Sequence, residues 1–551
     1  MKSITYTAAI KTAVIGSFIA ILLYLSGCDI TDPTDGIRAI LNTKERTTTV
    51  SVIFRDANTG EPVGFGNGMN VTTQITGPDS DKVIDLLNRR NSSFNAKNGF
   101  LSFAVQDDFP VSRDNPLRFN VVASAPGYIS TSMPVVLTNV SGNPIEVQMV
   151  SRSNAPDGVV GGSASNVGST TAATGTTSNI TINSQAVGRD MPVSVMVPQG
   201  TIMRDAGGNA LSGNVDAEIY HFSSRETSSL QSFPGGFSAT VANFDDFAST
   251  LPPGDPSRTS ADNGVFFTTG GFLSLEMRVG GTQVSTFSQP IDIEMELEDG
   301  VTDASGNPVT AGDTAPIWSY DEATGEWNFE GNTTIGVNKN NRASISFQAD
   351  HLSWWNIDWY GPRCYMGTRV NLIGNNSQLR GKLLRTDVTP NTFLGWAASR
   401  SLPGVPNFIQ FLQAPLNVPG KLELYNMADQ LVGTVDLPDL CSATDVDYQL
   451  GETTEITVTF RGVGTCVDND DIEIRPNFPA FYRPAVGGSW LSAGSVVNGE
   501  LEITLPAPGN YLFGAFYENE WYDYELDLTA AEDGDLFEEV VELPQSVCDD
   551  L

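Results

Sequence analysis

Histidine, cysteine and positive charge are all scarce in this 551-residue chain. It holds 2 His, 5 Cys and 30 Lys plus Arg, against 65 Asp plus Glu, which gives a formal net charge of −35. Proteins bind nucleic-acid backbones through clustered Lys and Arg. This excess of carboxylates therefore removes nucleic acid from the expected partners.

Common catalytic motifs are missing as well. The sequence contains no G-x-S-x-G, no G-x-x-x-x-G-K-[ST] and no H-E-x-x-H. His221 lies in the strand-like AEIYHFSS and His351 directly precedes LSWW, so we expect both to pack or hydrogen-bond in a core. We assign no catalytic residue and expect no enzyme. Carboxylate-pair chemistry stays open, because a glycosidase needs only two acids that the fold brings together.

The residues that are abundant indicate β-structure. Gly (53) and Pro (31) set turn dihedrals, and the many Val and Thr residues suit a pleated surface. A chain of this length is too long for a single core. We predict an all-β fold of tandem β-sandwich domains, transthyretin-like or Ig-like, behind an N-terminal leader.

The leader is short. Lys2 and Lys11 precede an apolar run over 13–25, which is shorter than the ~20 residues that a membrane-spanning helix needs. It has the pattern of a signal peptide over 1–27. The residues Leu-Ser-Gly before Cys28 resemble the lipobox of bacterial lipoproteins. The resemblance implies cleavage before Cys28 and acyl chains, such as palmitate, on that residue.

An acyl-modified Cys28 predicts anchoring to a membrane rather than spanning it, and two or three chains make the anchoring durable. Residues 28–46 are predicted to be an acidic tether. Asp29, Asp32 and Asp35 are typical of a solvated segment, and they also resemble the surface-export signals of Bacteroidota lipoproteins. The expected location is the bacterial cell envelope, at the outer membrane or the cell surface.

The other four cysteines, Cys364, Cys441, Cys466 and Cys548, all lie in the last third of the chain. An exported protein meets an oxidising compartment, so four cysteines predict two disulfides. We favour sequential pairing, Cys364 with Cys441 and Cys466 with Cys548, out of three connectivities. Zinc is disfavoured because no C-x-x-C pair is present.

The first predicted domain covers 47–150. Val50, Val52 and Phe54 alternate with polar residues, as in a half-buried strand, and a TGEPV turn follows. With the later APGYIS step, this segment resembles the carboxypeptidase regulatory-like domain, which implies a spacer or interaction module and no peptidase. Residues 151–185 are rich in Ser, Thr and Gly and have few large apolar side chains, so we predict a flexible linker.

The next predicted domain covers 186–360. VPQGTIMRDAGGNALSGNV resembles the start of the ZU domain of ankyrins and netrin receptors. WSYDEATGEW, followed by HLSWW, resembles cartilage intermediate layer proteins and their bacterial relatives. Both resemblances imply an extracellular β-sandwich with no activity attached. Two further sandwiches are predicted at 361–447 and 448–551, with a hairpin turning at Asp429.

Two clusters are candidate binding sites. Aromatic rings can stack on sugars, but we favour core packing here because alternation sends neighbouring tryptophans to opposite faces. The acidic run after Cys466 could bind calcium, but its spacing is not that of an EF-hand, and a solvated acidic face is the favoured interpretation. The residues of the two clusters are Trp354, Trp355, Trp359 and Tyr360 for a sugar, and Asp468, Asp470 and Asp471 for calcium.

The sequence as a whole predicts a lipid-anchored envelope protein that acts as a scaffold, an adhesion module or a ligand-binding module, with a polysaccharide or a protein as ligand. The alternative is a carboxylate-dependent glycoside hydrolase, or an accessory component of a polysaccharide-utilisation system.

Overall fold

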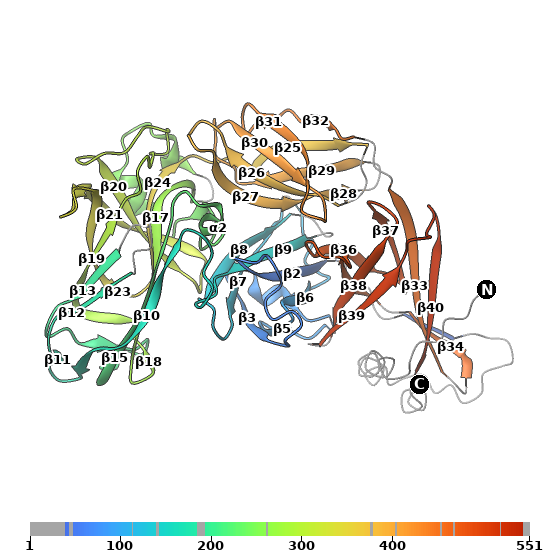
Figure 1. Cartoon of the computed structure of the whole chain (residues 1–551), viewed down its shortest axis with the longest axis horizontal. Coiled ribbons are helices and arrows are strands. Elements are labelled where there is room, and N and C mark those ends of the chain that lie inside the picture. The colour runs from blue at the N-terminus through green and yellow to red at the C-terminus, as the bar shows by residue number, and fades with distance from the viewer. Residues whose placement is uncertain are drawn as a thin grey trace.

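The computed structural model of the chain describes residues 39–42, 48–86, 88–112, 114–138, 143–184, 193–260, 263–374, 378–402, 405–451, 455–466, 469–475, 477–517 and 520–543. Strands dominate these residues, and they form four β domains, which confirms the all-β tandem architecture (Figure 1). Among the described residues, no helix has the length and apolar character needed to cross a bilayer.

The first domain is one eight-stranded sheet with the order β8-β7-β3-β5-β6-β2-β9, in which β4 also pairs with β6. Side chains from all seven strands of that order enter the same core, so the sheet curls around it. The strands are β2 (Thr49–Asp56), β3 (Asn70–Thr76), β4 (Val83–Ile84), β5 (Ser93–Lys97), β6 (Phe100–Val105), β7 (Leu117–Ser124), β8 (Thr131–Leu137) and β9 (Asn143–Met149), with a 3-10 turn at Ser80–Lys82.

Strand β2 differs from its prediction, because both of its faces are buried. Val50, Val52 and Phe54 enter the core of the first domain, as the alternation predicts. Ile53 and Arg55, on the other face, are also buried. Arg55 donates a hydrogen bond to the Trp490 carbonyl of the fourth domain at 2.7 Å. A neighbouring domain therefore covers the face that the pattern left to solvent.

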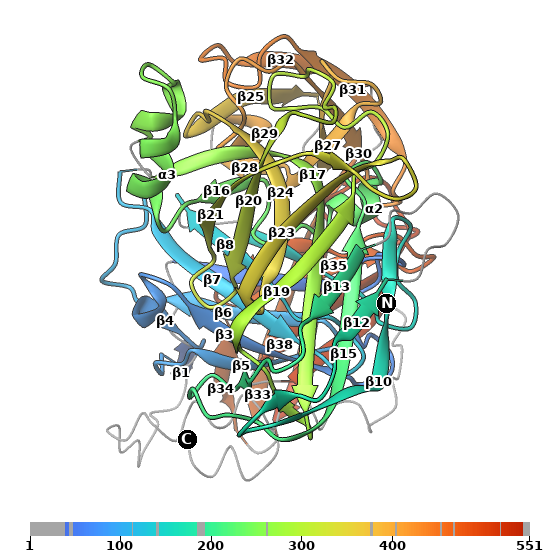
Figure 2. The ribbon, with the colours of Figure 1, turned by 90° about the vertical axis from the view of Figure 1, so that its left-hand side faces the viewer.

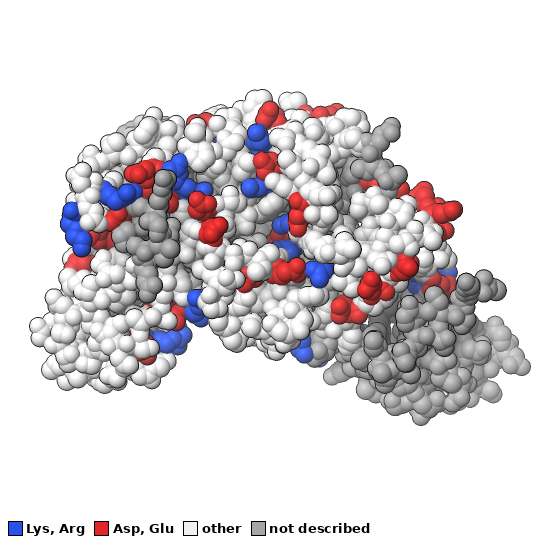
Figure 3. All heavy atoms as spheres, in the orientation of Figure 1, with Lys and Arg blue, Asp and Glu red and all other residues white. Residues whose placement is uncertain are grey.

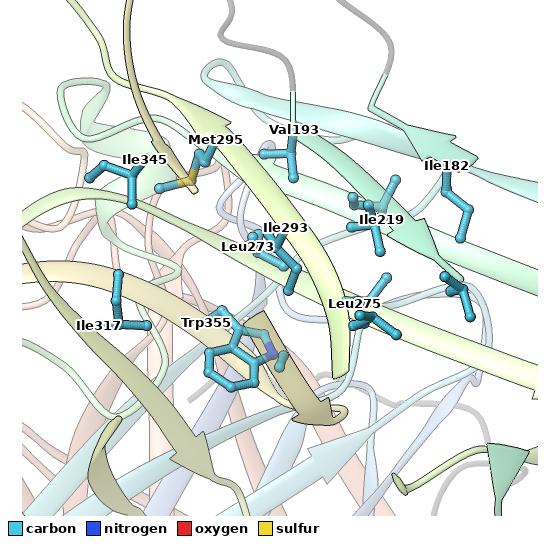
Figure 4. Close-up of a cluster of buried hydrophobic side chains, with 14 of the residues drawn as sticks. Ile182, Val193, Ile219, Leu273, Leu275, Ile293, Met295, Ile317, Ile345 and Trp355 are labelled. Carbon is cyan, nitrogen blue, oxygen red and sulfur yellow. The ribbon is translucent and has the colours of Figure 1, made fainter. Parts of the chain in front are cut away.

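The second domain is a sandwich of two sheets, β11-β10-β15-β17-β24-β20-β21 and β12-β13-β19-β23-β22. Its apolar core lies between them (Figure 4). The elements are β10 (Val159–Thr171), β11 (Gly175–Thr176), β12 (Ile180–Asn183), β13 (Val193–Val197), β14 (Met203–Arg204), β15 (Gly213–Phe222), α2 (Thr227–Leu230), β16 (Ser238–Thr240), α3 (Phe244–Thr250), a 3-10 turn at Pro256–Thr259, β17 (Gly264–Val279), β18 (Thr282–Gln283), β19 (Thr286–Glu296), β20 (Thr314–Asp321), β21 (Glu326–Thr334), β22 (Gly336–Val337), β23 (Ala343–His351) and β24 (Trp354–Gly361).

The flexible linker predicted over 151–185 is wrong. Strand β10 pairs along most of its length with β15, and β12 pairs with β13. The small residues serve close packing here: a Cβ on Gly161 would lie 2.2 Å from the Ile219 carbonyl, and one on Gly168 would lie 2.5 Å from Ile180 Cδ1. Backbone hydrogen bonds and neighbouring side chains hold this strand, so its own side chains need not be large.

The third domain is a sandwich of two four-stranded sheets, β28-β29-β25-β32 and β27-β26-β30-β31. The hairpin predicted around Asp429 is confirmed, since β30 and β31 pair antiparallel and Asp429 turns the chain with φ 55°. Strand β32 crosses the predicted boundary at 447/448 and Leu450 packs in the core of this sandwich, so the third domain extends at least three residues beyond that boundary. The strands are β25 (Met366–Ile373), β26 (Arg380–Arg385), β27 (Thr392–Ala398), β28 (Arg400–Leu402), β29 (Val405–Leu412), β30 (Gly420–Tyr425), β31 (Leu431–Leu437) and β32 (Val446–Gln449).

The fourth domain combines the sheet β36-β35-β38-β39 with a second sheet in which β1, β34, β33 and β37 are neighbours and β40 also pairs with β33. Strand β1 comes from the predicted tether, so the tether prediction is wrong for residues 39–42. The strands are β1 (Ala39–Asn42), β33 (Ile456–Cys466), β34 (Asn469–Arg475), β35 (Phe478–Pro484), β36 (Leu491–Val496), β37 (Glu500–Leu505), β38 (Asn510–Tyr517), β39 (Glu520–Asp527) and β40 (Leu536–Leu543).

The four domains pack against one another rather than forming an open string. The first domain lies between the second and the fourth, and the third covers them from one side (Figures 1 and 2). Tyr320 of the second domain shares a 2.7 Å hydrogen bond with Ser132 of the first. Arg363, at the start of the third domain, donates to Ser238 of the second at 2.7 Å.

Candidate functional site

Several predicted site residues lie outside the described part of the chain. These are Cys28, Cys548 and Asp468. Cys466, Asp470 and Asp471 lie on described strands, but their side chains are not described. Lipidation of Cys28, the second disulfide and a calcium site therefore stay predictions. The described residues include no group of three or more His, Cys, Asp or Glu side chains arranged to hold a metal ion.

The first predicted disulfide is confirmed. Cys364 and Cys441 are bonded, with their Cα atoms 5.9 Å apart. The bond joins the segment before β25 to the turn after β31, and it closes a sequence separation of 77 residues. Both cysteines pack against the core of the third domain, so the bond fixes the end of that sandwich.

The aromatic residues that were candidates for stacking on a sugar are largely buried. Trp354, Trp355 and Trp359 are 5%, 2% and 9% exposed, and Tyr360 packs against a buried cluster. As alternation predicts, Trp354 and Trp355 point to opposite faces of β24, into separate clusters of the second domain (Figure 4 shows Trp355). A sugar ring can stack only on an exposed aromatic face, so the three tryptophans serve packing.

A buried carboxyl lies on the same strand. Asp358 is fully buried; its Oδ2 accepts a hydrogen bond from Asn356 Nδ2 at 3.1 Å, and Thr269 also interacts with it. Burial raises its pKa to about 7, although the bonds from Thr269 and Asn356 work against the rise. Among the described atoms, Asp358 Oδ1 and Asn356 Oδ1 have no hydrogen-bond partner. The surroundings of Asp358 therefore favour the protonated form of its carboxyl.

The wild-type protein is expected to lose stability as pH rises and Asp358 ionises, and Asp358→Asn is expected to abolish that loss. A carboxyl whose folded pKa lies above its unfolded value stabilises the fold below the unfolded pKa and loses that contribution as pH rises through the folded pKa. Most of this loss falls between pH 3.8 and about 7, so from pH 6.5 to 8.5 only its last ~1 kcal/mol remains, and the wild-type melting temperature of the second domain should fall by about 2 °C while that of the variant stays level. Scanning calorimetry across this interval measures the difference.

The chosen interval avoids the titration of the buried His221. Burial lowers the pKa of His221 to about 4, so its protonation destabilises the fold only as pH falls below about 6.5. Asp216→Asn is a matched control, since this carboxylate on β15 lies in the same domain but accepts an exposed hydrogen bond from the backbone N–H of Asn166 on β10. Equal pH slopes in the wild type and in Asp358→Asn would contradict the assignment.

Carboxylates also gather where the first domain meets the second. Arg152 bridges Glu218 at 2.7 Å and Glu276 at 3.3 Å, and Glu322 accepts a 2.7 Å hydrogen bond from Trp354 Nε1. Burial raises the pKa of both Glu276 and Glu322. Because Arg152 pairs with two of the three glutamates and Trp354 bonds the third, these contacts describe an interdomain joint rather than a free acid/base pair.

The most extensive polar contact joins three domains. Glu146 of the first domain accepts from Arg55 at 3.0 Å and from Arg380 of the third at 2.9 Å. Arg380 also reaches Ser489 of the fourth domain at 2.8 Å and lies 3.3 Å from Asp429. We name this set of five residues, with the Trp490 carbonyl that accepts from Arg55, the junction network.

The junction network is mostly removed from water. The side chains of Arg55, Glu146 and Arg380 are 2%, 20% and 10% exposed. Burial opposes ionisation of Glu146, but the nearby charges of Arg380 and Arg55 outweigh it and hold its pKa at about 2. A buried charge of this kind is stable only while its partners stay in place, so the network fixes three domains relative to one another.

An aromatic cluster lies beside the junction network and joins the first domain to the fourth. Phe100 stacks on Trp521 with ring centroids 3.9 Å apart and packs edge-on to Trp490 at 5.3 Å. Phe481 lies 4.9 Å from the same Phe100 ring, and it belongs with Trp490 to the core of the first domain. The two domains therefore share one apolar core.

Sequence reasoning missed the junction network. Arg55 ends an alternating strand at a position where a large polar side chain signals an unusual partner, and Glu146 lies between Ile145 and Val147 in a similar strand. These two charged residues, each within an otherwise alternating apolar strand, were the signal in the sequence for the junction network. Arg55 and Arg380, the two partners of Glu146, lie 91 and 234 residues from it in sequence, and no spacing rule connects the three residues.

Comparison with known proteins adds little. No family model matches the chain, and no curated protein matches it. Among solved structures, similarity was found to GBS52, the minor pilin of Streptococcus agalactiae (8% identity, 32% of this chain and 94% of that one, TM-score 0.14), to the Bacillus anthracis TIE protein (8%, 93% and 76%, 0.14), and to BcpA, the major pilin subunit of Bacillus cereus (6%, 90% and 99%, 0.12). TM-scores this low support no inference about function.

Proposed function

We propose that this chain is a lipid-anchored protein of the bacterial cell envelope in which four β domains form a rigid, non-enzymatic scaffold for adhesion or ligand presentation. The observation that carries the proposal is the junction network with its shared apolar core, because a buried ion pair and stacked aromatics oppose reorientation of the domains. The lipobox-like residues before Cys28 support the anchor.

Rigidity changes how the scaffold works. A string of domains on flexible linkers samples many orientations, and binding a partner then costs the entropy of ordering them. A pre-organised body avoids most of that cost. A polysaccharide or a protein on the outside of the cell would meet loops whose positions are already set.

Cys28→Ala is expected to move the protein from the membrane fraction to the soluble fraction. Without the acyl chains the body lacks the apolar area that holds it, at about 0.8 kcal/mol for each buried methylene. Fractionation with immunoblotting measures the shift, and the double variant Cys466→Ala with Cys548→Ala is the control because it removes two other cysteines together and leaves the lipobox intact. Unchanged fractionation of Cys28→Ala would contradict the anchor.

A glycan array with residues 28–551 tests the non-enzymatic role, with and without calcium. Binding without release of sugar supports a presentation module. Release of reducing sugar would instead support the glycoside hydrolase, and the first variants to make would then be Glu276→Gln and Glu322→Gln, which remove the joint carboxylates with raised pKa values.

A further inference from the structure

Strand β1 pairs with the domain farthest from it along the chain. Ala39–Asn42 precede the first domain in sequence, yet they run parallel to β34 of the fourth, with Ile40 opposite Glu473 and Leu41 opposite Ile474. Strand β40, near the other end of the described chain, belongs to the same sheet with β34 and β33 lying between it and β1, because it pairs with β33 on the side away from β34. The first and the last described strands therefore share one sheet.

This sheet occupies one end of the molecule. Along the long axis, which is horizontal in Figure 1, β33, β34 and β40 lie towards the right-hand end, and β11, β15 and β18 of the second domain lie towards the left-hand end. The loops around β11 and β18 are therefore separated from β34, and from its partner β1, by most of the length of the molecule (Figure 1).

Chain length limits how far β1 can lie from Cys28. Eleven residue steps separate Cys28 from Ala39. A fully extended chain covers at most about 3.6 Å for each step, so the two residues are at most about 40 Å apart whatever the conformation between them. An acyl anchor on Cys28 consequently holds the β1 end of the molecule near the lipid.

The charge of this end fits a body that stands on the membrane rather than lying flat on it. Residues 466–551 hold 19 Asp and Glu against two Arg, and acidic side chains are visible over this part of the surface (Figure 3). Anionic headgroups repel such a surface, and the repulsion acts over about 8 Å at physiological salt. The tether would then hold the fourth domain close to the membrane while charge prevents its insertion.

We propose that the fourth domain is the membrane-proximal foot of the scaffold, facing the lipid headgroups, and that the loops of the second domain around β11 and β18 form its membrane-distal end. This inference rests on the lipid anchor of the proposed function. It assigns different surroundings to the two ends of the molecule: the lipid surface for the sheet that contains β1, and the exterior for the second domain.

Depth-dependent quenching tests the orientation. The full-length lipidated protein is placed in phosphatidylcholine vesicles that carry a nitroxide on the headgroup, and a fluorophore is attached through an encoded azide residue at Val540 or at Gln283. Val540 is 48% exposed on β40, and Gln283 is exposed on β18 at the far end. Quenching at Val540 should exceed quenching at Gln283 at least fivefold. Equal or reversed quenching would overturn the orientation.

Flotation of the same vesicles separates this failure from failure of the anchor. Protein that floats but shows equal quenching is anchored in another orientation. Protein that does not float lacks the anchor, and both proposals then fail. Adding phosphatidylglycerol should reduce quenching at Val540 and leave flotation intact, because added negative charge repels the acidic foot.

Docking of β1 can be tested without lipid. Neighbouring parallel strands are about 4.8 Å apart, which lies within disulfide range. Leu41→Cys with Ile474→Cys should therefore crosslink, and after proteolysis the N-terminal peptide should stay attached to the C-terminal fragment until reduction. Leu41→Cys with Gln283→Cys is the matched control. Absence of the first crosslink, or an equal yield of the second, would overturn the assignment.

Discussion

Glu146→Gln is expected to lower the free energy of unfolding by about 3–5 kcal/mol, the largest effect of any single substitution considered for this chain. The change keeps the shape of the side chain but removes the charge that lies 3.0 Å from Arg55 and 2.9 Å from Arg380. Both guanidinium groups are mostly buried, and a buried charge that loses its partner bears an uncompensated desolvation cost. Urea unfolding followed by tryptophan fluorescence measures the loss.

Glu61→Gln is the matched control. Glu61 also belongs to the first domain and pairs with Arg483 of the fourth at 3.0 Å, but its side chain is 52% exposed. An exposed pair contributes well under about 1 kcal/mol, because water and salt screen it. Similar losses in the two variants would show that burial of the junction network does not set its strength.

The same network predicts a dependence on acid. The folded pKa of Glu146, about 2, lies below its usual value of 4.5, so its contribution is complete above pH 4.5 and is lost as pH falls towards 2. The difference corresponds to about 3 kcal/mol. Wild-type stability should therefore fall by more than that of Glu146→Gln between pH 5 and 2.5, and parallel curves would contradict the assigned pKa.

Cys364→Ser with Cys441→Ser is expected to destabilise the third domain by about 4 kcal/mol. Without the crosslink, the unfolded chain regains the entropy of an open loop whose ends are 77 residues apart. Calorimetry under non-reducing conditions should show a lower melting temperature for this domain. The transitions of the other domains should move less, because the disulfide lies within one sandwich.

Reductant provides the control for the disulfide. Reduction of the wild type should lower the melting temperature of its third domain to that of the double variant. The same treatment should not change the melting of the third domain in the double variant. A double variant that melts at the wild-type temperature would show that the loop is already constrained by packing in the unfolded chain.

Local features of the fold were readable from the sequence wherever neighbouring residues decide the structure. The hairpin at Asp429 needed only a turn residue between two alternating strands, and the opposite directions of Trp354 and Trp355 followed from the twofold period of a strand. The pairing of Cys364 with Cys441 agreed with simple chain order. Each of these predictions depends on a spacing within a single domain.

The errors share a different cause. The small side chains of residues 151–185 predict a linker, but Gly161 and Gly168 are small so that neighbouring strands can approach. Strand β1 was assigned to a tether because the pairing that orders it lies more than 400 residues away. Composition reports what a segment can bury by itself and gives no information about which distant strand will cover it.

The sequence alone determined the fold class of this protein, through short alternating strands with turn residues between them, and it carries a strong negative charge and lipobox-like residues before Cys28. Only the tertiary structure decided that the four domains form one body. Arg55, Glu146 and Arg380 lie on three separate strands, and their ion pairs exist because the folded domains bring those strands together and exclude water from the contact. Periodicity acts over a few residues, whereas burial and charge compensation act across space, so the contacts between the domains become visible only once the chain is folded.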